Sequence, residues 1–415
     1  MRHAHVVLSV LFVLQTSVFA QSGWFPQPSG TINWLNSVHF VNANTGWAVG
    51  SYGTVLKTTN GGTTWEAQPP PSTGILRSVY FTGVDTGWAV GVGGIFKTTN
   101  GGASWITQAV SDNGFYSVRF VNAHTGWTVG PGSEFLPGVV VKTTNGGTTW
   151  SWQATWEGVP VSVWFVTVST GWAVGWGMIL ETTDGGATWS SQPSGTMNRL
   201  GSVCFVDANT GWAVGQSGTI LKTTDGGASW VGQSAGTSYL LTSVFFIDTD
   251  TGWVVGGEYS VAGLILKTTD GGASWSPQPG GTLNQLESVC FVNASTGWAV
   301  GQSGTILKTT SGGLVWADEP QLNNDPLPER LQLHQNYPNP FNPSTEIRFE
   351  TPSSSHISLR VFDLLGREIE NLVDEELMPG RYQATFDGAR FSSGVYIYRL
   401  EAGRFALTRK LVLHK

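Results

Sequence analysis

The sequence predicts an all-β protein, and three observations support this fold class. Charged residues make up only 12% of the 415 residues, against about 25% in an ordinary soluble domain, so few solvated helix faces can form. The chain contains 55 glycines and 20 tryptophans, which suit tight turns and large buried side chains. The third observation is an internal repeat that runs through most of the chain. Together they exclude helical bundles and coiled coils.

The charge balance narrows the classes of partner. A net charge of −7 lacks the excess of positive charge that nucleic-acid binding requires, so we expect no nucleic-acid partner. Hydrophobic residues amount to 40% of the chain, which is enough to bury a core and excludes disorder for most of it.

Residues 1–20 have the features of a secretory signal peptide. Arg2 and two histidines precede an apolar run from residue 6 to residue 14, and Ala20 places a small side chain at the cleavage position. We therefore expect cleavage between Ala20 and Gln21. An uncleaved anchor is the alternative, but this run is much shorter than the roughly 20 residues that span a bilayer. We expect no transmembrane segment in the mature form.

Residues 21–318 contain seven copies of one unit of about 40 residues, the length typical of repeat architectures. In each unit a Thr-Gly-Trp motif is followed by a turn of the form Thr-Thr-(Asn/Asp)-Gly-Gly-(Thr/Ala)-(Thr/Ser)-Trp, and the seventh turn is a weaker copy that ends at Trp316. The Thr-Gly-Trp tryptophans are Trp47, Trp88, Trp127, Trp172, Trp212, Trp253 and Trp298.

Alternating apolar residues and Gly-rich turns predict four short strands per unit, which is the size of a propeller blade. The sequence thus predicts a seven-bladed β-propeller. The segment after Trp24 is similar to the fourth strand that follows Trp189. We expect this extra strand to pair into the last blade and close the ring, because closure removes exposed edges. We expect a monomer.

The turn motif resembles the Asp-box, or bacterial neuraminidase repeat, and Thr58 to Trp65 fits it at each position. With the Trp-Ala-Val-Gly strand beside it, the repeat is similar to the seven-bladed photosystem II assembly factor family and its bacterial relatives. Asn or Asp in the box can accept hydrogen bonds from turn amides, so we expect a structural role for these residues. They are Asn60, Asn100, Asn145, Asp184, Asp225 and Asp270.

A calcium loop is the alternative interpretation of the boxes. Each box offers one carboxylate or amide, whereas calcium takes six to eight oxygen ligands. No His/Cys cluster has metal-binding spacing either. We therefore expect no metal and no cofactor.

The candidate binding site lies where each blade connects to the next. The residue before each Ser-Val strand differs between units, and a variable polar or aromatic side chain on a rigid scaffold suits recognition. If the Ser-Val strand is innermost, these side chains ring the mouth of the channel. Ordinary loop drift is the alternative. The candidate ligand-binding residues are Trp34, Asn36, Arg77, Tyr116, Arg199, Tyr239 and Glu287.

Catalysis is the less favoured function. A sialidase-like site needs three clustered arginines, yet the repeats contain only Arg77, Arg119 and Arg199, and Arg119 lies within a strand. A xyloglucanase-like inverting site needs two carboxylates about 6.5–9.5 Å apart. Outside the boxes, candidates such as Glu134, Glu157, Glu258 and Glu287 are scattered one per unit without pairing. We name no catalytic residue and keep an extracellular glycoside hydrolase as the alternative function.

Residues 319–334 form a polar, Pro-punctuated linker, and residues 335–415 alternate like the strands of a small immunoglobulin-like β-sandwich. The segment Asn336 to Thr345, the Phe362 to Arg367 segment and the basic end near Arg409 look like a type A sorting domain of the type IX secretion system. That resemblance implies export through the periplasm of a diderm bacterium, recognition by the outer-membrane translocon, and removal of the tail in the linker. An adhesive or carbohydrate-binding module is the alternative.

These expectations combine into one functional prediction. The chain is a secreted or cell-surface propeller that binds or scaffolds a protein or a glycan.

Overall fold

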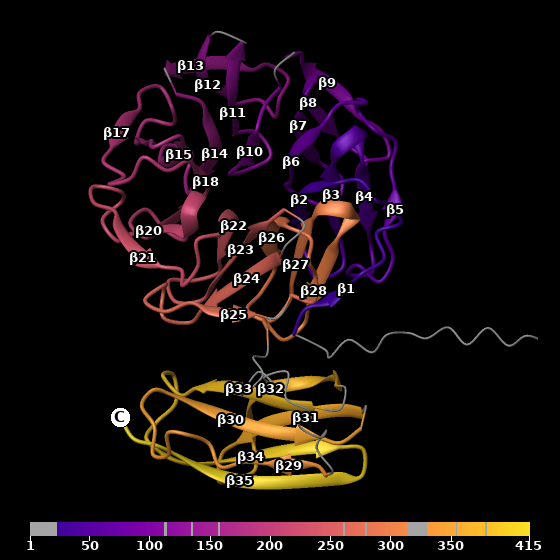
Figure 1. Ribbon diagram of the computed structural model, residues 1–415, viewed down its shortest axis with the longest axis vertical. Coiled ribbons are helices and arrows are strands. Elements are labelled where there is room, and N and C mark those ends of the chain that lie inside the picture. Colours follow the sequence, from indigo (N-terminus) through magenta and orange to yellow (C-terminus); the bar gives the residue numbers. More distant parts are fainter. Residues whose placement is uncertain are drawn as a thin grey trace, which may run out of the picture.

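The computed structural model describes residues 23–111, 114–133, 136–156, 158–259, 262–278, 280–313, 330–353, 355–377 and 380–415. They form a ring of seven four-stranded sheets and a smaller β-sandwich (Figure 1). This confirms the predicted fold class. The predicted signal peptide, with its cleavage site at Ala20 and Gln21, lies outside the described residues. No helix in the described ranges is long and apolar enough to cross a membrane.

Each of the first six blades is a meander whose strands follow chain order. Blade 1 comprises β2 (Leu35–Phe40), β3 (Gly46–Gly50), β4 (Val55–Thr58) and β5 (Glu66–Ala67). Blade 2 comprises β6 (Leu76–Phe81), β7 (Gly87–Gly91), β8 (Gly94–Thr98) and β9 (Ile106–Ala109). Blade 3 comprises β10 (Ser117–Phe120), β11 (Gly126–Ser133), β12 (Leu136–Thr143) and β13 (Ser151–Trp156).

Blades 4 to 6 repeat this order. Blade 4 comprises β14 (Pro160–Phe165), β15 (Gly171–Gly175), β16 (Ile179–Thr182) and β17 (Ser190–Gln192). Blade 5 comprises β18 (Leu200–Phe205), β19 (Gly211–Gly215), β20 (Thr219–Thr223) and β21 (Val231–Ser234). Blade 6 comprises β22 (Leu240–Phe246), β23 (Gly252–Glu258), β24 (Ala262–Thr268) and β25 (Ser276–Gln278). Short 3-10 turns follow the second strand of blades 1, 5 and 7: Ser51–Gly53, Gln216–Gly218 and Gln302–Gly304.

The seventh blade joins the two ends of the ring. It contains β26 (Leu286–Phe291), β27 (Gly297–Gly301), β28 (Ile306–Thr309) and, as its outer strand, β1 (Phe25–Pro26) from the N-terminal side. Trp24 is 1% exposed and meets Phe291 edge-on with ring centroids 5.6 Å apart. In blade 1 the box tryptophan Trp65 meets Phe40 in the same way. The predicted closure by an extra fourth strand is therefore present, and Trp24 fills the place of a box tryptophan.

Tryptophan stacking joins each blade to the next. The ring of Trp47 lies on Phe81 of blade 2 with centroids 3.5 Å apart and an interplanar angle of 6°, and its Nε1 donates to the carbonyl oxygen of Gly101. Because the indole is fully buried and its polar atom is bonded, it adds apolar burial without an unpaired donor. The same stack recurs at all seven junctions.

A ring of serines joins the innermost strands. The Oγ atom of Ser37 accepts a hydrogen bond from the backbone N–H of Val79 on the next blade, at 3.2 Å. Equivalent bonds run around the whole channel, so the Ser-Val motif is explained by contacts between blades. The seven serines are Ser37, Ser78, Ser117, Ser162, Ser202, Ser243 and Ser288.

The C-terminal unit is a two-sheet sandwich. One sheet contains β29 (Gln332–Leu333), β30 (Ser344–Thr351) and β33 (Gly380–Asp387), and the other contains β31 (Ser355–Phe362), β32 (Glu368–Leu377), β34 (Gly394–Ala402) and β35 (Phe405–Leu413). Its core includes Ile347, Leu359, Tyr398 and Leu411, all fully buried. The Tyr398 hydroxyl donates to the carbonyl oxygen of His334 at 2.7 Å, so the start of the domain is tied to its core.

Candidate functional site

The course of the chain separates two faces of the propeller. The box turns and the turns between the first and second strands share one face, where the N–H of Gly61 donates to the carbonyl oxygen of Asn44. The connections between blades and the turns between the second and third strands share the other, which we call the mouth face. Six of the seven innermost strands start with a register shift just before the serine, as between Leu35 and Ser37. This shift places the variable residue at the channel mouth.

Four of the predicted residues form a charged and aromatic group at the mouth. The Arg77 guanidinium lies 4.3 Å from the centroid of the Tyr116 ring, a cation–π contact between blades 2 and 3. Arg199 enters from the connection into blade 5, where its backbone N–H is held by Gln216. Glu287 comes from the inner strand of blade 7. All four are partly buried. We call Arg77, Tyr116, Arg199 and Glu287 the mouth cluster.

The charges of the mouth cluster shift one another's pKa values. Burial lowers the pKa of Arg77, and repulsion from Arg199 lowers it further, while Tyr116 opposes the shift. Burial raises the pKa of Glu287 to about 7, with the positive charge of Arg199 acting in the opposite direction. In the described part of the chain every ion pair lies in the sandwich, so these charges have no salt-bridge partner there. Charged groups held partly buried without partners are typical of binding sites.

The other predicted residues are placed differently. The Asn36 amide donates to the backbone oxygen of Leu76 on the next blade, at 2.8 Å, which is a structural contact between blades. Trp34 is 40% exposed and packs against Tyr259, with ring centroids 5.9 Å apart. Tyr239 lies in the connection into blade 6, and its backbone is bonded to Thr237 and Gly218. The mouth cluster therefore contains four of the seven candidates.

Sequence reasoning did not select several exposed aromatic residues of the mouth face. Tyr52, Trp176 and Tyr259 are 79%, 60% and 62% exposed, and all three lie in turns between a second and a third strand. Exposed aromatic side chains on one face are typical of interaction surfaces. Their position in the repeat is the signal that could have found them, because the equivalent residues of other units are small or polar.

The box residues are used within their own turns. The Thr58 hydroxyl accepts from the N–H of Gly62 at 2.8 Å and donates to Oδ1 of Asn60, which in turn accepts from the N–H of Thr64 at 2.9 Å. Gly61 and Gly62 have φ of +69° and +93°, which favour glycine. In the Asp boxes hydrogen bonds from Thr188 lower the pKa of Asp184 to about 2. Among the described residues no group of three or more His, Cys, Asp or Glu could hold a metal.

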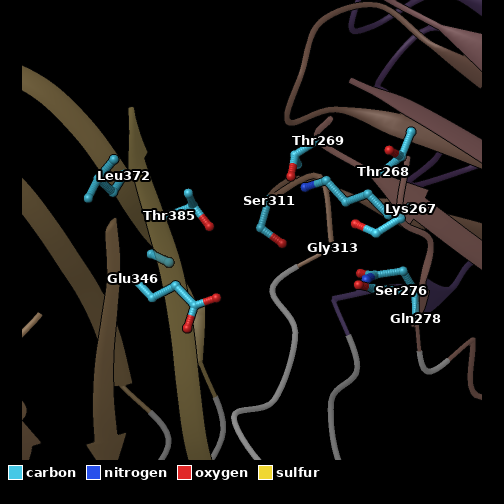
Figure 2. A pocket seen from close by; sticks show the side chains of 12 residues that line it. Lys267, Thr268, Thr269, Ser276, Gln278, Ser311, Gly313, Glu346, Leu372 and Thr385 are labelled. Atoms are coloured by element: carbon cyan, nitrogen blue, oxygen red, sulfur yellow. The ribbon is translucent and has the colours of Figure 1, made fainter. Parts of the chain in front are cut away.

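A cavity of about 230 Å³ lies between the box turns of blades 6 and 7 and the sandwich (Figure 2). Lys267 and Gln278 point toward it from the propeller, and Glu346 and Thr385 line it from the sandwich. The connection between the two units, residues 314–329, lies outside the described ranges. We assign this cavity no role, because the expected removal of the sorting domain would abolish it.

Two family models match the chain. The model described as "Photosynthesis system II assembly factor YCF48" matches residues 17–108, 151–234 and 194–279, which together span more than half of the chain. The model described as "Secretion system C-terminal sorting domain" matches residues 335–414. No curated protein matches the chain significantly.

Solved structures support the same fold. A structure of YCF48 bound to a D1 peptide is 20% identical, covers 70% of this chain and 98% of its own, and has a TM-score of 0.58. YCF48 from Cyanidioschyzon merolae is 23% identical, with 69% and 98% coverage and a TM-score of 0.57. The WD40 propeller domain of Doa1 is 12% identical, with 70% and 97% coverage and a TM-score of 0.55. The chain therefore belongs to the family of photosystem II assembly factor YCF48-like repeat propellers, and it carries a C-terminal secretion sorting domain.

Proposed function

We propose that the exported propeller is a binding module that recognises a segment of another protein at its channel mouth. The observation that carries this proposal is the mouth cluster, in which Arg77 contacts Tyr116 and the charge of Arg199 acts on both Arg77 and Glu287, while none of these charges has a salt-bridge partner among the described residues. Such groups offer both charge-assisted hydrogen bonds and an aromatic surface to a ligand. The related YCF48 structure was solved with a D1 peptide bound, which supports peptide recognition as the kind of function.

A glycan is the second candidate ligand. The exposed Trp34–Tyr259 pair on the mouth face supports it, because aromatic rings with polar edges can cover the apolar face of a sugar. The two candidates differ in the residues that they require. A peptide ligand depends on the mouth cluster, and a glycan depends on Trp34 and Tyr259.

A glycoside hydrolase remains the alternative, and Glu287 is the residue that favours it. A carboxyl group with a pKa near 7 suits a general acid. Hydrolysis also needs a second carboxylate at the proper separation, and Glu258 is the nearest candidate in sequence on the mouth face. Release of reducing sugar from a bound glycan would favour this alternative over binding alone.

The sorting domain implies secretion or display at the cell surface in a Bacteroidetes-type bacterium. We further propose the route: signal-peptide cleavage, passage through the periplasm, recognition of residues 335–415 by the translocon, and cleavage within residues 319–334. The intact mass of the extracellular form tests this route. A form that ends beyond residue 335 would contradict the cleavage.

The binding proposal is tested with the mature chain on peptide and glycan arrays, with reducing-sugar release measured on each glycan that binds. The variant Arg77→Ala/Tyr116→Ala/Arg199→Ala should lose a peptide ligand, and Trp34→Ala/Tyr259→Ala should lose a glycan. Asp85→Ala/His124→Ala is the control, because both residues are exposed on the box face. Retention of every ligand by the triple variant would refute a site at the mouth cluster.

A further inference from the structure

Below the mouth, the channel is narrowed by the residue that follows each Ser-Val pair. These seven residues are His39, Tyr80, Arg119, Trp164, Cys204, Phe245 and Cys290. Six of them, together with five of the ring serines, line a cavity of about 130 Å³ in the channel. That space is large enough for water molecules or for a small ion.

Arg119 is the positively charged residue that lines this cavity. Its guanidinium lies 3.6 Å from the centroid of the Trp164 ring and 5.0 Å from that of Tyr80. Its Nε atom is buried and has no hydrogen-bond partner among the described residues, and no carboxylate there pairs with it. The aromatic contacts stabilise the cation from its faces, but they leave N–H groups at its edge without acceptors.

Three titratable groups near Arg119, namely His39, Cys204 and Cys290, are uncharged at neutral pH. Burial lowers the pKa of His39 to about 4, and the positive charge of Arg119 lowers it further. Burial raises the pKa of both Cys204 and Cys290 to about 11. Both thiols are free. Arg119 therefore contributes the formal charge of this cavity.

The ring serines add hydroxyl donors. Each serine Oγ accepts one bond from a valine N–H, which leaves its single hydroxyl proton available. None of the seven protons has an acceptor among the described residues. Ser78, Ser117, Ser162, Ser202 and Ser243 line the same cavity as Arg119. A small cavity that combines a cation with several unused donors has the chemistry of an anion site.

We propose that the central channel binds a small inorganic anion, a halide or a compact oxyanion, between the Arg119 guanidinium and the hydroxyls of the ring serines. The anion would connect inner strands of several blades and neutralise a charge that the protein itself leaves unpaired. This site lies below the mouth cluster and does not depend on the ligand proposed for the mouth.

The first test uses the full mature chain, with unfolding followed by tryptophan fluorescence. The signal reports the propeller, because residues 330–415 contain no tryptophan. Sodium gluconate, whose anion is much larger than a halide, is replaced by sodium chloride or sodium bromide at constant ionic strength. We expect a saturable rise in the unfolding midpoint. Arg119→Met should weaken the apparent affinity at least tenfold, whereas Arg199→Met, which removes a mouth arginine, should keep it.

The second test does not depend on how the variant folds. Wild-type crystals soaked in bromide and measured at the bromine edge should show an anomalous peak beside Arg119. A peak without a saturable shift in solution would mean an adventitious ion only and would overturn the proposal. The absence of a peak, an unchanged response in Arg119→Met, or a response lost only in Arg199→Met would overturn it as well.

Discussion

Replacement of Glu287 by glutamine should change the stability of the propeller in a pH-dependent way. Burial raises the pKa of Glu287 from its ordinary 4.5 to about 7. At about 1.4 kcal/mol per pKa unit this difference corresponds to about 3 kcal/mol. Because the folded state binds this proton more tightly than the unfolded state, the stabilising contribution is complete below pH 4.5. It is lost as the pH rises through 7.

The assay is guanidinium unfolding at pH 4 and pH 8.5, with tryptophan fluorescence as the signal. Glutamine stays neutral at both values, so Glu287→Gln avoids the cost of a buried charge at pH 8.5. We expect the free energy of unfolding of the variant, relative to that of wild type, to be about 2–3 kcal/mol higher at pH 8.5 than at pH 4. Glu66→Gln, on the exposed outer strand of blade 1, is the matched control.

Arg199 provides an internal check on the same reasoning, because its positive charge favours the ionised form of Glu287. Arg199→Met should therefore raise the pKa of Glu287 further and enlarge the difference between wild-type and glutamine side chains at pH 8.5. If Glu287→Gln differs from wild type by the same free energy at pH 4 and pH 8.5, the electrostatic account of the mouth cluster is wrong.

Three further predictions concern the scaffold, and the same unfolding assay checks each of them. The pKa of His39 is lowered to about 4, so neutral His39 contributes folding stability above pH 6.5 that is lost as the pH falls through 4. The wild-type free energy of unfolding should therefore fall by about 3 kcal/mol more than that of His39→Phe when the pH is lowered from 6.5 to below 4. An equal fall in the two proteins would contradict this prediction. Trp24→Ala should lower the free energy of unfolding by about 3–5 kcal/mol because it leaves a cavity in the blade that closes the ring. Trp152 is 61% exposed, so Trp152→Ala should lower it little. Equal losses in the two variants would refute the role of Trp24 in closure. Thr58→Val should cost about 1–3 kcal/mol because it leaves a buried glycine N–H unpaired, with exposed Thr63→Ala as control.

Much of the fold could be predicted from the sequence, because each blade repeats the same local chemistry. The Gly-Gly turns, the alternating strands and the Thr-Gly-Trp motif each specify structure within about 20 residues. Even the closing strand was visible, since the segment after Trp24 repeats the pattern after Trp189. The same alignment sets Trp24 opposite the box tryptophan Trp189, and the structure adds the partner of its ring, Phe291.

The candidate site was less predictable, because its residues come from blades far apart in the chain. Their common place in the repeat predicted that Arg77, Tyr116, Arg199 and Glu287 would ring the channel, but not which would interact. Asn36 occupies the same repeat position, yet its amide is used between blades. The sequence placed Arg119 in a variable strand position, and the packing of blade 3 against blade 4 brings it onto Trp164.

The separation of fixed and variable positions suggests how this scaffold could change its ligand. Stacked tryptophans, box side chains and ring serines form their contacts within and between blades in every unit. The residues just before and just after each Ser-Val pair differ between units, and only some of them add contacts between blades, as Asn36 and His39 do. The residue before the pair lies at the mouth, and six of the seven residues after it line the channel interior. Substitutions at the first position should therefore alter recognition, while those at the second should alter the proposed anion site and the stability of the ring.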